Sequence, residues 1–226
     1  QINCITIPES VSELKNGWCK GIKSSTKINI SPKNKTFKMI EDKFIVGKKQ
    51  NNKDEGEDKY EILYFYQGNS NEIIIPDYIS EISSYCFCSN ESLISIKFTP
   101  NSKLINICKS AFKYSSIKSI IIPKHVRQIS DRAFKSSEIE TIEFEPESEF
   151  THIVQSMFYY SSIKSIVIPK HVKQICDSAF KNSYLETIEF EPESELTDIC
   201  ESAFEYCTIK SIIIPKHVKQ IGNFAF

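Results

Sequence analysis

The sequence lacks several features that mark common functional classes. Its 226 residues carry 28 basic and 29 acidic side chains, so no basic excess points to nucleic acid or an anionic membrane as the partner. No apolar run approaches the ~20 residues that a helix needs to cross a bilayer. Only six glycines are present, which leaves little for a phosphate-cradling turn. We therefore expect neither nucleic-acid binding nor membrane insertion within this segment.

Cysteine is also too sparse for a disulfide scaffold, with eight residues in the whole chain. The chain begins at Gln1 without a Met or a signal peptide, and it ends on "IGNFAF", partway through a repeat. We interpret it as a fragment of a longer protein, in which any secretion or anchoring signal lies outside the sequence.

What the sequence does contain is an internal repeat. The segment "IKSIIIPKHVRQI" (117–129) returns with few changes at 163–175 and 209–221, a period of 46 residues. A related segment lies between the copies, as in "IETIEFEPESEFTHIVQSMF" (139–158) and again at 185–204. The period is thus a basic unit and an acidic unit, of 22 and 24 residues. Repeats of about 20 to 29 residues indicate a stacked solenoid.

The residue pattern within each unit predicts one strand. In "IKSIIIP" the alternation places Ile117, Ile120 and Ile122 inward, and Ser119 and Ile121 outward. Equivalent strands then pair into a parallel sheet, and the proline that follows ends the pairing. A short helical or 3₁₀ turn is expected to carry the Ala-Phe pair that closes the unit.

A phenylalanine recurs at the end of each unit, and we expect these rings to stack through the core as an aromatic spine. The members are Phe87, Phe112, Phe134, Phe158, Phe180, Phe204 and Phe226.

The pattern "LxxIxIPxxVxxIxxxAFxxC/S" resembles the BspA-like (Treponema pallidum-type) leucine-rich repeat, clearly from about 70 to 226 and weakly from 1 to 32. It lacks the Asn or Cys ladder of the common leucine-rich repeat and has a nearby proline instead, as this class does. The resemblance implies an α/β-type solenoid with right-handed curvature and a parallel β-sheet on the concave face. It also implies a cell-surface or extracellular protein engaged in adhesion.

The chain divides into three expected segments of one solenoid domain. Residues 1–32 form partial leucine-rich repeats, 33–69 form a β-hairpin insertion, and 70–226 form the continuous repeats. The insertion is expected to be an antiparallel meander of two or three strands with a solvated loop over 48–59.

Three tyrosines of the insertion, Tyr60, Tyr64 and Tyr66, are candidate recognition contacts, because binding residues are often found on loops. The alternative, which we favour, is that they cap a discontinuity in the core. Alternation already accounts for half of the insertion's aromatic residues as inward-facing.

Histidine and cysteine follow the repeat and predict no metal site. Two-unit stacking puts His125, His171 and His217 about 10 Å apart, too far to share a metal ion. Cys176 and Cys200 occupy equivalent positions on adjacent units, which makes them a candidate disulfide. Small buried residues are the favoured interpretation of the cysteines.

Outward positions form columns when the strands are aligned. The signs alternate along the first column, so neighbours attract and a register slip of one unit is disfavoured. Its members are Lys118, Glu140, Lys164, Glu186 and Lys210.

The next two columns, one of hydroxyl and one of alternating aliphatic and charged side chains, are expected on the concave face, the usual contact surface of such solenoids. Ordinary scatter of exposed aliphatic residues is an equal alternative. The candidate ligand-binding residues are Ser95, Lys97, Ser119, Ile121, Thr141, Glu143, Ser165, Val167, Thr187, Glu189, Ser211 and Ile213.

These features favour a non-enzymatic binding or adhesion module that needs no cofactor and has no catalytic residues. Its partner would be a protein or a glycan on a host or matrix surface. A structural solenoid that self-associates end to end, or an intracellular protein-interaction scaffold, is the alternative.

Overall fold

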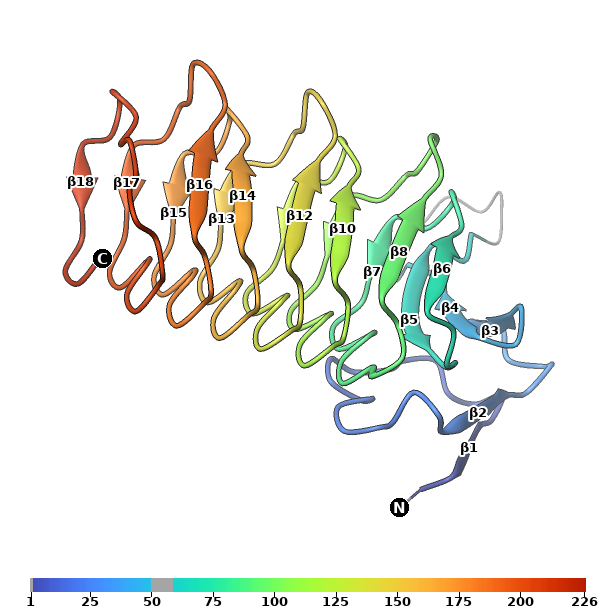
Figure 1. The fold of residues 1–226 in the computed structure, drawn as a ribbon. Helices are drawn as coiled ribbons and strands as arrows, with labels where there is room; N and C mark the ends of the chain where they lie inside the picture. Colours follow the sequence, from blue (N-terminus) through green and yellow to red (C-terminus); the bar gives the residue numbers. More distant parts are fainter. Residues whose placement is uncertain (1, 50–58) are drawn as a thin grey trace.

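The computed structural model describes residues 2–49 and 59–226, and these residues form a parallel-strand β-solenoid (Figure 1). Each repeat makes one turn of the stack, and from β6 to β17 a turn has a long strand on one side and a short strand on the other. No helix occurs within the described residues. Sequence periodicity thus predicted the stacking correctly.

The long strands form one six-stranded parallel sheet whose spatial order follows the chain order. In each strand an outward Ser, Thr or Glu is followed by a buried Ile, an exposed residue and a further inward side chain. The β-branched residues suit this half-buried surface. The strands are β6 (Glu72–Ile75), β8 (Ser95–Phe98), β10 (Ser119–Ile122), β12 (Thr141–Phe144), β14 (Ser165–Ile168) and β16 (Thr187–Phe190).

Short strands of two residues line the opposite side of the stack, each with an isoleucine in its second position. This isoleucine is buried in every short strand except β18, where Ile221 is 51% exposed at the end of the stack. They belong to two sheets. One contains β7 (Glu81–Ile82), β9 (Asn106–Ile107) and β11 (Gln128–Ile129); the other contains β13 (His152–Ile153), β15 (Gln174–Ile175), β17 (Asp198–Ile199) and β18 (Gln220–Ile221).

The N-terminal part departs from the regular stack. Strands β1 (Cys4–Ile7) and β2 (Lys27–Ile30) pair in parallel, whereas β3 (Phe37–Ile40), β4 (Phe44–Gly47) and β5 (Ile62–Tyr66) form an antiparallel meander. Strand β5 also pairs in parallel with β7, so the meander extends the short-strand sheet. Most of the loop expected over 48–59 lies outside the described residues.

The aromatic spine is confirmed. Neighbouring rings from Phe87 to Phe226 stack with centroids 5.0 to 5.6 Å apart and interplanar angles of 2° to 12°. The row continues, tilted, through Tyr66 to Phe44, both buried. One contiguous aromatic row therefore joins the meander to the repeats.

The expected short helical turn is not found, because two residues in each turn adopt the left-handed region. Ser110 and Tyr114 both have φ near 58°, a conformation that costs a non-glycine residue about 1–2 kcal/mol. With the chain reversed there, the Phe112 N–H donates to the Ala133 carbonyl of the next turn at 2.8 Å. Bonds between turns thus alternate with local bonds such as that from the Lys113 N–H to the Ser110 carbonyl at 3.2 Å.

Candidate binding face

The outward side chains of the six long strands form a continuous surface, here called the sheet face. Its hydroxyl column is in register from strand to strand: Ser95 pairs with Ser119, Ser119 with Thr141, and Thr141 with Ser165. Thr187 follows in the same register. Five of the predicted contact residues therefore lie side by side, as the repeat alignment indicated.

The second column is divided into pairs. Ile121 lies opposite Glu143, and Val167 lies opposite Glu189. Between these pairs the strands diverge, because the register of β12 with β14 covers only Thr141–Ile142 and 165–166. The same shortened register joins β8 to β10. Each aliphatic side chain is thus flanked by one close carboxylate and by one open seam.

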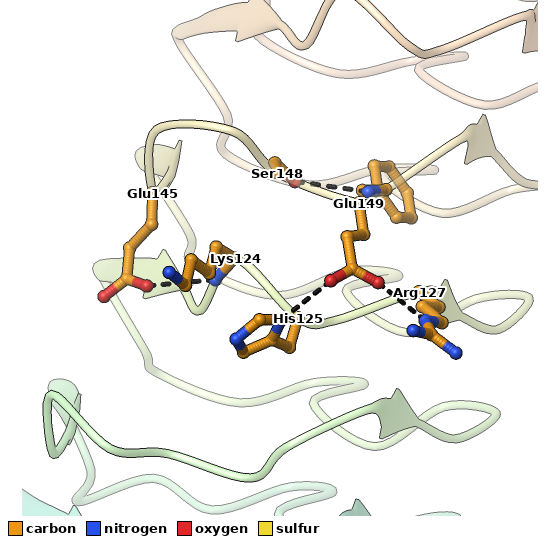
Figure 2. Close-up of polar contacts among 7 residues, drawn as sticks. Lys124, His125, Arg127, Glu145, Ser148 and Glu149 are labelled. Carbon is orange, nitrogen blue, oxygen red and sulfur yellow. Dashed lines mark hydrogen bonds and ion pairs between the residues drawn. The ribbon is translucent and has the colours of Figure 1, made fainter.

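A clasp joins a basic unit to the acidic unit after it (Figure 2). The Lys124 N–H donates to the Glu145 carboxylate of the next unit at 3.0 Å, while the Glu149 carboxylate contacts His125 Nδ1 and Arg127 Nε, each at 2.7 Å. The acidic loop therefore folds back onto the preceding basic unit. Its seam with the following basic unit stays open.

The clasp recurs one period later. Lys170 N–H donates to Glu191 at 2.8 Å, and His171 Nδ1 lies 2.8 Å from Glu195. A basic unit and the acidic unit after it thus form one closed block, which accounts for the 46-residue period in structural terms.

The open seams hold clefts. One of about 500 Å³ extends over β12, β14 and β16, and its walls include Glu143, Phe144 and Val167. A larger cleft of about 960 Å³ separates β16 from residues 210–216, with Glu189 on one wall. Both clefts combine apolar side chains with carboxylates, which suits a partner that brings aliphatic and basic groups.

Ser211 and Ile213 do not join the columns. The expected strand over 209–214 is not formed, and Ile213 is 89% exposed on the far wall of the larger cleft. In the described chain, no backbone hydrogen bond links 209–216 to β16. The contacts that reach back come from side chains: the Thr208 hydroxyl donates to the Leu185 carbonyl at 3.0 Å, and Lys216 Nζ lies 3.7 Å from the Glu193 carboxylate. This seam, like the one between β12 and β14, follows an acidic unit.

Charge pairing on the sheet face follows the predicted alternation over part of its length. Glu140 contacts Lys118 at 3.6 Å and Lys164 at 2.5 Å. The hydrogen bond from Lys164 lowers the pKa of the Glu140 carboxyl. Glu186 and Lys210, the last predicted members, show no ion pair within the described residues.

Two contributors escaped the sequence prediction. The Glu72 carboxylate accepts from Ser95 Oγ at 3.1 Å and pairs with Lys97 Nζ at 2.9 Å, and the Lys97 contact lowers the pKa of Glu72. Ile74 is exposed opposite Lys97. Alignment of "EIIIP" with "KSIIIP" would have placed both residues on the face, whereas nothing in the sequence reveals the seams.

The meander tyrosines are mostly structural. Tyr66 is buried and stacks 5.7 Å from Phe87, so it is a spine residue and not a contact. Tyr64 is half-buried, edge-on to Phe37 at 5.1 Å. Tyr60 is half-buried beneath the Lys38 ammonium, 4.0 Å from its ring centroid. The core interpretation therefore holds for Tyr66.

Cys176 and Cys200 are free thiols, so the candidate disulfide is not present. The Gln174 side chain contacts both sulfur atoms, at 3.7 Å to Cys176 and 3.1 Å to Cys200. Burial raises the pKa of Cys176 to about 11. Within residues 2–49 and 59–226, no group of three or more His, Cys, Asp or Glu side chains could hold a metal ion.

Parallel strands, inward aliphatic residues and a continuous aromatic spine define a leucine-rich-repeat β-solenoid. The family model described as BspA type leucine rich repeat region matches six copies over residues 61–186 and 151–226, and the chain belongs to this family. This confirms the resemblance derived from the repeat pattern.

Solved structures of similar fold come from three bacteria. A leucine-rich repeat protein from Eubacterium ventriosum matches with a TM-score of 0.77 and 20% identity, covering 99% of this chain and 58% of its own. A leucine rich cell surface protein from Faecalibacterium prausnitzii matches with a TM-score of 0.65 and 22% identity, covering 87% and 52%. A leucine-rich repeat protein from Bacteroides ovatus matches with 0.53 and 24%, covering 71% and 48%.

The chain therefore spans about half the length of these proteins. No protein of curated function matches the sequence. In the parts of the chain that the structure describes, no helix has the length and apolarity that crossing a bilayer requires.

Proposed function

We propose that this chain is a non-enzymatic adhesion module that presents its sheet face to a protein ligand outside the cell. One observation carries the proposal: exposed aliphatic side chains, each beside a carboxylate, border clefts that recur with the repeat. The Faecalibacterium relative, described as a cell surface protein, supports the extracellular setting.

The exposed side chains of the sheet face indicate which kind of ligand it would bind. Val167 is 49% exposed beside Glu189, and Ile121 is 53% exposed beside Glu143. A protein segment with alternating aliphatic and basic side chains would bury the former and pair with the carboxylates. Apolar contacts at the centre of such an interface supply most of the affinity, and the charges supply selectivity.

The experiment compares two matched variants in binding to immobilised matrix proteins and to host cells. Val167→Lys removes the apolar contact and places a cation beside Glu189; the column already contains such a residue at Lys97, so folding should be retained. Gln128→Lys introduces the same cation on the short-strand side. We expect Val167→Lys to weaken binding at least about tenfold, near 1.4 kcal/mol, while Gln128→Lys binds as the wild type does.

Equal binding by both variants would move the contact away from the sheet face. Light scattering on each sample separates ligand binding from end-to-end association of the solenoid, which would appear without any ligand.

A further inference from the structure

Exposed tyrosines gather far from the sheet face, on the turns that lead from the short strands back to the long strands. Tyr114, Tyr160 and Tyr206 are 53%, 56% and 72% exposed and occupy the same position in successive 24-residue units. They are therefore about 10 Å apart along the stack. Tyr159 adjoins Tyr160, edge-on at 4.7 Å. We call these four residues the tyrosine ridge; its turns follow the lower edge of the stack in Figure 1.

The turn itself does not require tyrosine. Tyr114, Tyr160 and Tyr206 have φ of 58°, 56° and 59°, a region uncommon for bulky residues. The intervening basic units place Ser136 and Asn182 at the same position with nearly the same φ. Asparagine tolerates this conformation better than tyrosine does. Local stability therefore does not explain why the 24-residue units carry tyrosine.

A cluster of cations accompanies the ridge. Lys113 Nζ lies 4.7 Å from the Tyr114 ring centroid, and Lys135 Nζ lies 4.5 Å from that of Tyr159. Burial, and then the nearby charges of Lys113 and Arg132, lower the pKa of Lys135. None of these three cations has a carboxylate partner among the residues that the structure describes. The ridge thus presents flat aromatic faces together with uncompensated positive charge.

The spacing distinguishes the ligands that fit such a surface. Consecutive nucleic-acid bases lie much closer together than 10 Å, so they do not match the interval between the ridge tyrosines. An acidic protein segment has no flat apolar faces at fixed intervals. A linear polysaccharide presents the C–H faces of its sugar rings at regular steps, and a disaccharide is about as long as the distance between ridge tyrosines.

We propose that the tyrosine ridge binds a linear anionic polysaccharide. Its sugar rings pack on the exposed tyrosines, and its sulfate or carboxylate groups pair with Lys113, Lys135 and Arg132. This site is separate from the sheet face, so one module can hold a protein ligand and a glycan at the same time.

The test uses the whole chain and a size-defined heparin dodecasaccharide as the probe, with binding measured by calorimetry at physiological salt. The triple variant Tyr114→Asn, Tyr160→Asn, Tyr206→Asn introduces the residue that the chain itself has at Asn182. We expect its affinity to fall at least tenfold while its thermal midpoint stays equal or rises. Lys135→Gln should weaken binding and reduce its salt dependence.

Two control variants and two control ligands define the outcomes. Tyr78→Ser changes a partly exposed tyrosine in the loop between β6 and β7, and Val167→Lys changes the sheet face; both should bind the dodecasaccharide as the wild type does. Absence of binding by the wild type, or unchanged binding by the triple variant, would overturn the proposal. Equal affinity for a neutral dextran oligomer or for poly-glutamate would overturn it too, because either charge or sugar would then be irrelevant.

Discussion

The imidazole Nδ1 of His125 lies 2.7 Å from the carboxylate of Glu149 in the next turn, and His171 repeats the contact with Glu195 at 2.8 Å. This contact closes the seam between a basic unit and the acidic unit after it. The opposite seam is crossed by the Lys164–Glu140 ion pair and opens into a cleft. The closed seams and the clefts on the sheet face therefore recur with the same 46-residue period.

Stability should depend on pH through the clasp. Hydrogen bonds from His125 and Arg127 lower the pKa of Glu149 below 4.5 in the folded chain. A lowered folded pKa contributes stability that is complete above the unfolded value and is lost as pH falls through the folded value. Glu149→Gln should therefore lower the thermal midpoint above pH 4.5, and the difference from wild type should shrink below it.

Glu147→Gln is the matched control, because Glu147 is an exposed neighbour in the same loop. It should leave the midpoint unchanged across the same pH range. A constant difference between Glu149→Gln and wild type at every pH would contradict the clasp.

The spine should dominate stability. Phe158 is fully buried, with ring centroids 5.5 and 5.1 Å from its two neighbours. Phe158→Ala should cost about 3–5 kcal/mol through lost burial and a cavity. Chemical denaturation measures this loss, and a cost under about 1 kcal/mol, typical of surface sites, would refute the spine. Phe226→Ala, whose ring is 56% exposed, should cost much less.

Charge alternation on the sheet face should be measurable at low salt. Lys164 contacts Glu140 at 2.5 Å, so Lys164→Glu places two carboxylates side by side. We expect a lower thermal midpoint, with the loss reduced by added salt. Lys109→Glu, an exposed site outside the column, should change little. Unchanged stability of Lys164→Glu at low salt would count against the alternation.

Cys176 should react slowly with alkylating reagents. Burial and the nearby Cys200 raise its pKa to about 11, and only the thiolate is nucleophilic. Its alkylation rate should rise with pH well beyond neutrality. Peptide mapping without reductant should recover Cys176 and Cys200 as free thiols, whereas a crosslinked peptide would restore the disulfide that the sequence suggested.

Much of the architecture could be predicted from the sequence, because stacking places equivalent residues of every unit in the same environment. A phenylalanine occurs seven times at the position of Phe158, so its burial could be predicted. Backbone conformation is harder to predict. Ser110 and Tyr114 adopt the left-handed region in place of the expected helical turn, although neither serine nor tyrosine is a residue type that indicates this conformation. The sequence around Ser211 matches that of the sheet strands, so it predicts a strand there. Whether the strand pairs depends on how the preceding acidic loop folds, which the repeat pattern does not reveal.

The sheet face as the ligand-binding surface is tested most directly by carboxyl footprinting with and without a captured matrix-protein ligand. Glu143 and Glu189 are exposed and border the clefts, whereas Glu201 is exposed at the turn after β17. Bound ligand should slow carbodiimide labelling of Glu143 and Glu189 and leave Glu201 unchanged. Labelling of Glu143 and Glu189 at the same rate in the complex would contradict the proposed function.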